Sequence, residues 1–265
     1  MKKHLLPLIL LFLSFSGSLQ AQENNTIKAV ITYAFSHLRD TTKGAEPYRE
    51  NMDLFLSPSS SWYKSADKDS IYALMVSNFA ASGHKVISYI PFIEEELFLD
   101  FPDHTLLIKD KFWDDYLIED EWPAINWQIS NETLSISGLN CQKAIGEWRG
   151  RTYTAWFSSD LPYQAGPWKL NGLPGLIIEA YDTNKEIVFK FAGFHTISDG
   201  SEAIEMPTKG IKTTLKEYQE MREAFRQDIA GNINAARGRT VVISTPGLKP
   251  PTNQGIQNPI ELIKN

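Results

Sequence analysis

Few residues in this chain have the identity and spacing that catalysis requires. The histidines His37, His84, His104 and His195 are scattered, and none forms the His-x-x-x-His or His-Glu-x-x-His pair of a zinc site. No Gly-x-Ser-x-Gly sequence offers the sharp turn that presents a serine nucleophile. The sequence therefore predicts no catalytic residue, no metal site and no cofactor. The alternative is a hydrolase whose site assembles from distant carboxylates and His195.

Two further groups could take part in chemistry. Glu179 and Asp182 could serve as paired carboxylates, but three positions apart on a strand they point to opposite faces of the sheet. Cys141 is the only cysteine, so the chain has no internal disulfide. It stands in a strand-like run and not at a helix N-terminus that would activate a thiol, and we expect it to be buried and unreactive.

The chain carries an unusually acidic stretch between residues 94 and 121, which could suggest calcium. Its carboxylates lack the Asp-x-Asp-x-Asp-Gly spacing of a dedicated calcium loop, so we interpret the stretch as a solvated face. The acidic residues are Glu94, Glu95, Glu96, Asp100, Asp103, Asp110, Asp114, Asp115, Glu119, Asp120 and Glu121.

Binding is a better prospect, because large aromatic side chains gather near predicted turns. Trp156 and Trp168 could form a platform for a sugar, a peptide or a lipid, although such rings fill protein cores first. Arg151 and Asp160 flank one predicted strand, and we expect them to form a bracing ion pair more readily than a ligand site. The candidate binding residues are Arg151, Trp156, Asp160, Trp168, Leu173 and Pro174.

These residues must be positioned by a corner at residues 172–182, where two glycines and a proline precede an apolar run. This composition predicts a tight turn that feeds into a buried strand, with a hairpin partner at residues 186–191. We expect the glycines and Leu176-Ile177 to support the fold, while Trp168, Leu173 and Pro174 face outward or line a pocket. The predicted structural motif comprises Cys141, Gly166, Pro167, Gly172, Gly175, Leu176 and Ile177.

The rest of the chain alternates apolar and polar residues in short runs, as β-strands do. After residue 213 the period changes to that of one long amphipathic helix, with a Thr214–Glu217 capping box, a stripe that continues to Ile229, and an end at Gly238. The fold class expected is mainly β (α+β), a curved antiparallel sheet or partly open barrel clasping that helix. Strands are predicted at 26–35, 51–56, 86–90, 96–99, 105–108, 127–129, 134–136, 141–148, 151–157 and 240–244, and a second helix at 67–79.

The N-terminus predicts export. Lys2 and Lys3 precede an apolar run that ends in small residues, which is typical of a signal peptide spanning 1–21, with cleavage after Ala21. Residues 22–265 then form a single domain whose 24 basic and 32 acidic residues give a net charge of −8, after Lys2 and Lys3 are removed from the 26 basic residues of the whole chain. So acidic a surface argues against nucleic acid as a partner.

The corner sequence Gly-Leu-Pro-Gly-Leu-Ile at residues 172–177 resembles the motif that names the GLPGLI family of exported bacterial envelope proteins. Flanking residues agree with that resemblance, and a proline missing from residues 157–162 is a local departure from it. The flanking matches are Cys141, Lys143-Ala144, Gly150-Arg151, Tyr153, Ala155-Trp156, Pro162, Gly166-Pro167-Trp168 and the closing Asn258-Pro259-Ile260-Glu261-Leu262. The family has no established activity, so the resemblance implies a location and an architecture but no reaction.

Together these observations predict an exported, non-catalytic protein of the periplasm or outer membrane. We expect it to bind a small apolar, peptide or sugar ligand, or an outer-membrane or other envelope partner. The hydrolase described above and a purely structural envelope protein are the alternatives.

Overall fold

The computed structural model describes residues 24–68, 93–198, 202–227 and 257–262. The predicted signal peptide and the predicted strands at 86–90 and 240–244 lie outside these residues, as does most of the predicted helix at 67–79 and the end of the long helix.

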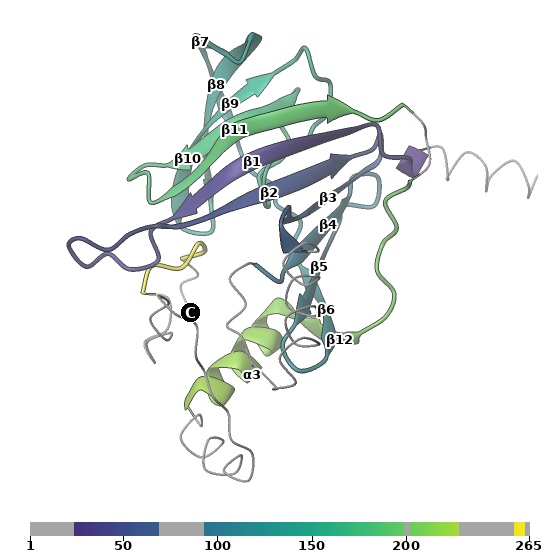
Figure 1. Ribbon diagram of the computed structural model, residues 1–265, viewed down its shortest axis with the longest axis vertical. Helices are drawn as coiled ribbons and strands as arrows, with labels where there is room; N and C mark the ends of the chain where they lie inside the picture. Colours follow the sequence, from purple (N-terminus) through teal and green to yellow (C-terminus); the bar gives the residue numbers. More distant parts are fainter. Residues whose placement is uncertain (1–23, 69–92, 199–201, 228–256, 263–265) are drawn as a thin grey trace, which may run out of the picture.

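The described residues form one twelve-stranded sheet in the order β12-β6-β5-β4-β3-β2-β1-β11-β10-β9-β8-β7. Neighbouring strands are antiparallel, except that β12 runs parallel to β6. The sheet curves strongly and stays open, with β7 and β12 at its edges (Figure 1). The strands are β1 (Ala29–His37), β2 (Tyr48–Leu56), β3 (Ser60–Ser65), β4 (Glu96–Asp100), β5 (Thr105–Lys111), β6 (Asp115–Asp120), β7 (Gln128–Ile136), β8 (Leu139–Trp148), β9 (Arg151–Ser158), β10 (Leu176–Asp182), β11 (Ile187–Thr196) and β12 (Ile211–Thr214).

Alternation along the strands explains the two apolar faces of the sheet. In β1 the side chains of Ala29, Ile31 and Tyr33 join a large core cluster, whereas Val30 joins a smaller cluster on the opposite face. Ile204 belongs to that smaller cluster, and its main-chain N–H donates to the carbonyl oxygen of Asn25 at 2.9 Å. The expectation of a mainly β protein with a curved sheet is therefore confirmed.

The long helix expected from residue 213 to Gly238 is not supported, since the described part of the chain has only a short helix there. The helix α3 covers Leu215–Gln227, and it lies beside β6 and β12 instead of being clasped by the whole sheet (Figure 1). Its predicted capping box is confirmed, since the N–H of Thr214 donates to Glu217 Oε2 at 3.0 Å and the N–H of Glu217 to Thr214 Oγ1 at 3.3 Å. No described helix is long and apolar enough to cross a membrane.

Another prediction that fails is the division of residues 127–136 into two strands, 127–129 and 134–136. The structure has one continuous strand, β7, in place of two short strands. Ile129 lies opposite Ala144 and Thr133 opposite Gln142, so four steps on β7 face two steps on β8. The polar residues between the two predicted strands are accommodated as a bulge in an edge strand, where extra residues disturb few hydrogen bonds.

The corner at residues 172–177 has the backbone that its glycines predict. Gly172 and Gly175 have φ angles of 88° and 155°, which L side chains rarely adopt. At Gly175 a Cβ would also lie 2.3 Å from the carbonyl oxygen of Ser158. The N–H of Ile177 donates to the carbonyl oxygen of Ala165 at 3.0 Å, so a hydrogen bond joins the corner to the loop that precedes it.

Candidate functional site

The structure corrects the predicted exposure of the corner. Trp168 and Leu173 were expected to face outward or to line a pocket, but they are buried in the main core with 6% and 1% exposure. The loop between β9 and β10 packs against the main core, and these two apolar side chains gain free energy by leaving water. Pro174 and Asp160 are exposed, and Trp156 is half-buried. Among the predicted binding residues these three are therefore the ones that reach solvent, whereas Arg151 is buried.

Trp168 itself has an unusual backbone, with a φ angle of 54° in a residue that is not glycine. The turn is closed by the N–H of Leu170, which donates to the carbonyl oxygen of Pro167 at 3.1 Å. This left-handed step sends Trp168 into the core while the next side chain, that of Lys169, points to a cluster of carboxylates. The ammonium group of Lys169 lies 5.3 Å from the centre of the Trp168 ring.

Arg151 is the first member of a buried charged network. Its Nη1 atom lies 2.7 Å from Asp182 Oδ2 and 3.2 Å from Glu186 Oε2. The bracing pair predicted between Arg151 and Asp160 is therefore wrong. Asp160 follows the far end of β9, whereas Asp182 ends the neighbouring antiparallel strand and lies next to the start of β9.

The remaining donors of Arg151 reach the C-terminal segment 257–262. Nη2 donates to Asn258 Oδ1 and, at 2.6 Å, to the carbonyl oxygen of Pro259, while Nε donates to the carbonyl oxygen of Ile260 at 3.1 Å. With the two carboxylates, all five N–H groups of the guanidinium are used, which is the full capacity of an arginine.

A second part of the network holds Glu261. Lys169 Nζ contacts Asp120 Oδ2 at 2.6 Å and also Glu261, and Arg149 contacts the same two carboxylates at 2.6 and 3.4 Å. Burial alone would raise the pKa of Asp120, but Lys169 and Arg149 outweigh it and hold that pKa below its ordinary value. We call the C-terminal segment 257–262 the tail, and the rest of the described chain the body. The charged body residues of this network are here called the tail clamp, which consists of Asp120, Arg149, Arg151, Lys169, Asp182 and Glu186.

His37 also belongs to this region. Its Nε2 atom lies 2.7 Å from the carbonyl oxygen of Asn258, and burial lowers the pKa of the imidazole to about 4. A neutral, buried histidine of this kind is a structural partner of the tail. His195, which the hydrolase alternative invoked, is exposed near the end of β11, and the described residues place no carboxylate in hydrogen-bond contact with it. Among those residues no group of three or more potential ligands could hold a metal ion.

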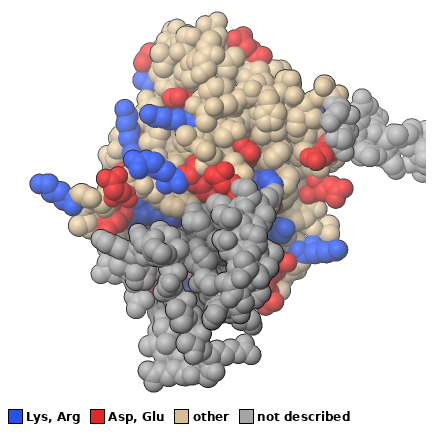
Figure 2. All heavy atoms as spheres, viewed as in Figure 1, with Lys and Arg blue, Asp and Glu red and all other residues tan. Residues whose placement is uncertain are grey.

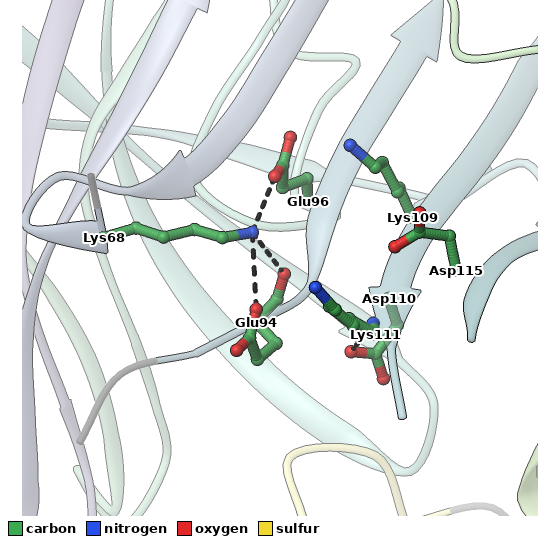
Figure 3. A pocket seen from close by; sticks show the side chains of 7 residues that line it. All are labelled: Lys68, Glu94, Glu96, Lys109, Asp110, Lys111 and Asp115. Atoms are coloured by element: carbon green, nitrogen blue, oxygen red, sulfur yellow. Dashed lines mark hydrogen bonds and ion pairs between the residues drawn. The ribbon is translucent and has the colours of Figure 1, made fainter. Parts of the chain in front are cut away.

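Away from the tail clamp, a pocket of about 210 Å³ opens at β4, β5 and β6 (Figure 3). One side is fixed by Lys68, whose Nζ lies 2.7 Å from Glu96 Oε1 and 3.5 Å from Glu94 Oε2. Trp62 Nε1 donates to the other oxygen of Glu96 at 3.1 Å. The space, here called the lysine pocket, is lined by Lys68, Glu94, Glu96, Lys109, Asp110, Lys111 and Asp115.

The floor of the lysine pocket is joined to α3 through Asp110. The hydroxyl of Tyr218 donates to Asp110 Oδ2 at 2.6 Å, and Arg222 Nη1 lies 3.2 Å from the same oxygen. Asp110 and Glu96 are buried and paired, as is Asp120 in the tail clamp. The interpretation of residues 94–121 as a solvated face is therefore wrong for these carboxylates, because alternation along β4–β6 turns some of them inward.

Lys109, Lys111 and Asp115 differ from the other charged residues of the pocket. Within the described part of the chain, their side chains make no hydrogen bond and no ion pair. Figure 3 shows the two ammonium groups extending from β5 toward the side of the pocket that holds Glu94 and Glu96. The sequence offered one missed signal, since Lys109-Asp110-Lys111 on a strand places both lysines on one face and Asp110 on the other.

The pKa of Glu95 responds to charged residues of both the lysine pocket and the tail clamp. Burial and the nearby charge of Asp110 raise its pKa to about 7, while Lys169 and Arg222 act in the opposite direction. A carboxyl group with this pKa is partly protonated at neutral pH. Figure 2 shows charged side chains gathered along the middle of the molecule, with a largely uncharged surface above them.

Part of the tail clamp lies in a segment that matches a known sequence family. Residues 147–179 match the sequence family described as "Protein of unknown function (Porph_ging)", which is the GLPGLI-type family. The resemblance to the GLPGLI family is confirmed. The matched segment runs from the end of β8 through β9 and the corner into β10, and it contains the three basic residues of the tail clamp, Arg149, Arg151 and Lys169. No curated protein matches the sequence.

Two solved structures of PNGF-II resemble the fold of this chain. The structure in space group P21 has a TM-score of 0.51 at 15% identity, and the one in C2 has 0.52 at 14% identity. The similarity covers 74% of this chain but only 33% and 32% of the PNGF-II chains, so this chain spans about a third of their length. At this level of identity the likeness shows a shared fold alone.

Proposed function

We propose that this chain is an exported, non-catalytic envelope protein that binds a small carboxylate-bearing ligand in the lysine pocket. The observation that carries the proposal is the state of Lys109 and Lys111, which border the pocket without an ion-pair partner in the described structure. The other lysine of the pocket, Lys68, is held between two glutamates. A ligand anion would supply the missing partner.

The spacing of the two lysines suits a small anion. Residues two apart on a strand point to the same face about 7 Å apart, so one carboxylate can accept hydrogen bonds from both ammonium groups. Asp115 lies opposite Lys111 in the register of β5 and β6 and offers an acceptor for a cationic group. A zwitterion such as an amino acid therefore matches the uncommitted charges best. The pocket volume, about 210 Å³, also favours a ligand smaller than drug-sized molecules, whose pockets are typically ~300–1,000 Å³.

Calorimetric titration of the full chain with acetate, glycine and inorganic phosphate tests this function. We expect glycine to bind more tightly than acetate, because only glycine also engages Asp115. The double variant Lys109→Gln with Lys111→Gln should weaken binding at least tenfold. Lys212→Gln, which changes an exposed lysine on β12, is the matched control and should bind like the wild type. Absence of binding by all three probes, or equal binding by the double variant, would overturn the proposal.

Export and an envelope partner are proposed on the N-terminal sequence and the family resemblance. Sequencing the N-terminus of the protein recovered from the cell envelope should give residue 22 as the first residue. Pull-down from detergent-solubilised envelope, with the wild type and the double lysine variant as baits, tests for an outer-membrane partner. A partner lost in the double variant would use the lysine pocket, and a partner retained by both would use another surface.

A further inference from the structure

We infer that the tail clamp is a peptide-recognition site for an Asn-Pro-x-Glu segment, occupied here by the chain's own residues Asn258–Glu261. The clamp can take the same segment as a separate peptide. This inference is independent of the lysine pocket and of the ligand proposed for it.

The tail is bound in the way a peptide is bound. It forms no strand with the sheet, and its main-chain contacts at either end are the N–H of Asn258 to the carbonyl of Arg39 at 3.1 Å and the N–H of Leu262 to the carbonyl of Arg149 at 2.8 Å. Between these ends, Arg151 reads the carbonyl groups of Pro259 and Ile260. Main-chain groups position such a segment without regard to its sequence, so specificity must come from its side chains.

The first source of specificity is the glutamate. Arg149 and Lys169 share one buried carboxylate outside the tail, that of Asp120; Glu121 also lies 3.5 Å from Arg149, but its side chain is 84% exposed and water screens it. The buried groups of this half of the clamp therefore carry one excess positive charge. Glu261 supplies the missing negative charge and contacts both bases. A neutral residue at this position would leave a buried cation incompletely paired, which is costly.

The second source of specificity is the asparagine, and its half of the clamp has the opposite balance. Arg151 faces two body carboxylates, Asp182 and Glu186, so this half carries one excess negative charge. The side-chain amide of Asn258 meets it with both of its functions: Oδ1 accepts from Arg151, and Nδ2 donates to Glu186 Oε2 at 3.0 Å. An acidic residue would add a third carboxylate here, so an amide is the matching group.

Several ion pairs of the clamp do not involve the tail. The pairs Arg151–Asp182, Lys169–Asp120 and Arg149–Asp120 join only residues of the sheet, of the β8–β9 turn and of the loop between β9 and β10. Gly150 completes the cradle, because a Cβ there would lie 2.7 Å from the carbonyl oxygen of Leu262. A site that is organised before its ligand arrives loses little entropy on binding.

Fluorescence anisotropy with a labelled Gln-Asn-Pro-Ile-Glu-Leu peptide tests the inference. The recipient is the full chain carrying Asn258→Ala and Glu261→Ala, which weakens its own tail and leaves the clamp intact. We expect this variant to bind the peptide at least tenfold more tightly than the wild type, whose tethered tail competes at an effective concentration of the order of millimolar. A peptide with the same two alanine substitutions is the control and should bind at least tenfold more weakly.

If the Asn258→Ala, Glu261→Ala variant has a wild-type circular dichroism spectrum but binds no peptide, the inference is overturned. Equal binding of the two peptides would also overturn it. Where the double variant fails to fold, Glu261→Gln serves as the recipient under the same criteria. The Lys109→Gln, Lys111→Gln variant should keep the wild-type behaviour toward the peptide. Failure of the ligand titration therefore leaves the peptide result unaffected, and the two proposals fail separately.

Discussion

The tail clamp and the lysine pocket are built from the same residue types, yet their charges are satisfied differently. In the tail clamp the side chains of Arg151 and Lys169 are 4% exposed, and every N–H group of Arg151 has a partner. In the lysine pocket Lys109 is half-buried and Lys111 exposed, and neither has a partner in the described residues.

Desolvation explains the difference between the two regions. A fully buried charge is tolerated only when other groups replace its water, so a clamp that lies in the core must be complete. A lysine at the rim of a pocket keeps part of its hydration and can exchange that water for a ligand. Completed networks therefore indicate structural or tightly occupied sites, and uncommitted charges beside a hollow indicate where a ligand is recognised.

The largest expected effect comes from Arg151→Met, which removes the centre of the tail clamp. The side chain keeps its approximate volume, but Asp182 and Glu186 lose their cation and the tail loses its main anchor. We expect a loss of about 3–5 kcal/mol in the free energy of unfolding, as for other broken buried ion pairs. Urea denaturation measures it, and Lys111→Met is the matched control with an expected change within about 0.5 kcal/mol. Similar losses in both variants would contradict the distinction between the two regions.

A smaller effect is expected from acid, through His37. Its pKa falls from 6.5 to about 4 on folding, so the unfolded chain binds more protons between these values and stability decreases as the pH falls through that window. The stabilisation is fully present above pH 6.5, and its loss by pH 4 amounts to about 3 kcal/mol. His37→Asn should remove this slope, whereas His104→Asn, at an exposed turn, should retain it.

The pH measurement needs one correction, because Glu95 acts in the opposite direction. Its pKa rises from 4.5 to about 7 on folding, so it favours the folded state at low pH and loses that contribution as the pH rises through this window. Glu95 is only partly buried, and water reduces the size of its effect. The comparison of the histidine variants is therefore best made in a Glu95→Gln background. A flat profile there between pH 4 and 6.5 would refute the role given to His37.

The glycines of the corner, which follows Lys169 in the same loop, give a third prediction. Gly172→Ala places a side chain at a positive φ angle in open space, and we expect a loss of about 1–2 kcal/mol. Gly175→Ala adds a clash with the carbonyl oxygen of Ser158, so its loss should exceed that of Gly172→Ala by a further amount of roughly 1 kcal/mol or more. Thermal melts of the two variants make the comparison. Equal melting temperatures would show that the main chain at Gly175 can yield.

Local patterns in the sequence were sufficient for the features that depend on neighbouring residues. The positive φ angles at Gly172 and Gly175, the adjacent strands at 141–148 and 151–157 and the Thr214–Glu217 capping box all follow from strand, turn and cap chemistry within a few positions. Cys141 is buried, as its strand-like surroundings indicated.

The tail clamp could not be predicted in the same way. Arg151 and Asn258 are 107 positions apart, and nothing in either neighbourhood specifies the other. Leu173 gave a misleading signal, because a turn composition suggests exposure and only the folding back of the loop buries it. The carboxylates of residues 94–121 misled for a similar reason. Which of them point inward depends on the register of β4–β6 and on the packing of α3.

The smallest expected effect on stability belongs to the Lys109→Gln, Lys111→Gln variant, and it is also the most informative about function. Among the described residues neither ammonium group has a partner to lose, so the free energy of unfolding should stay within about 0.5 kcal/mol of the wild type. Removing two positive charges beside Asp115 and Glu94 should selectively lower the affinity for anionic ligands. Raising the salt concentration should reduce ligand binding by the wild type, because exposed charges are screened. Denaturation and calorimetry on the same preparations separate these quantities. A large loss of stability would mean that the two lysines serve the fold, as Arg151 does.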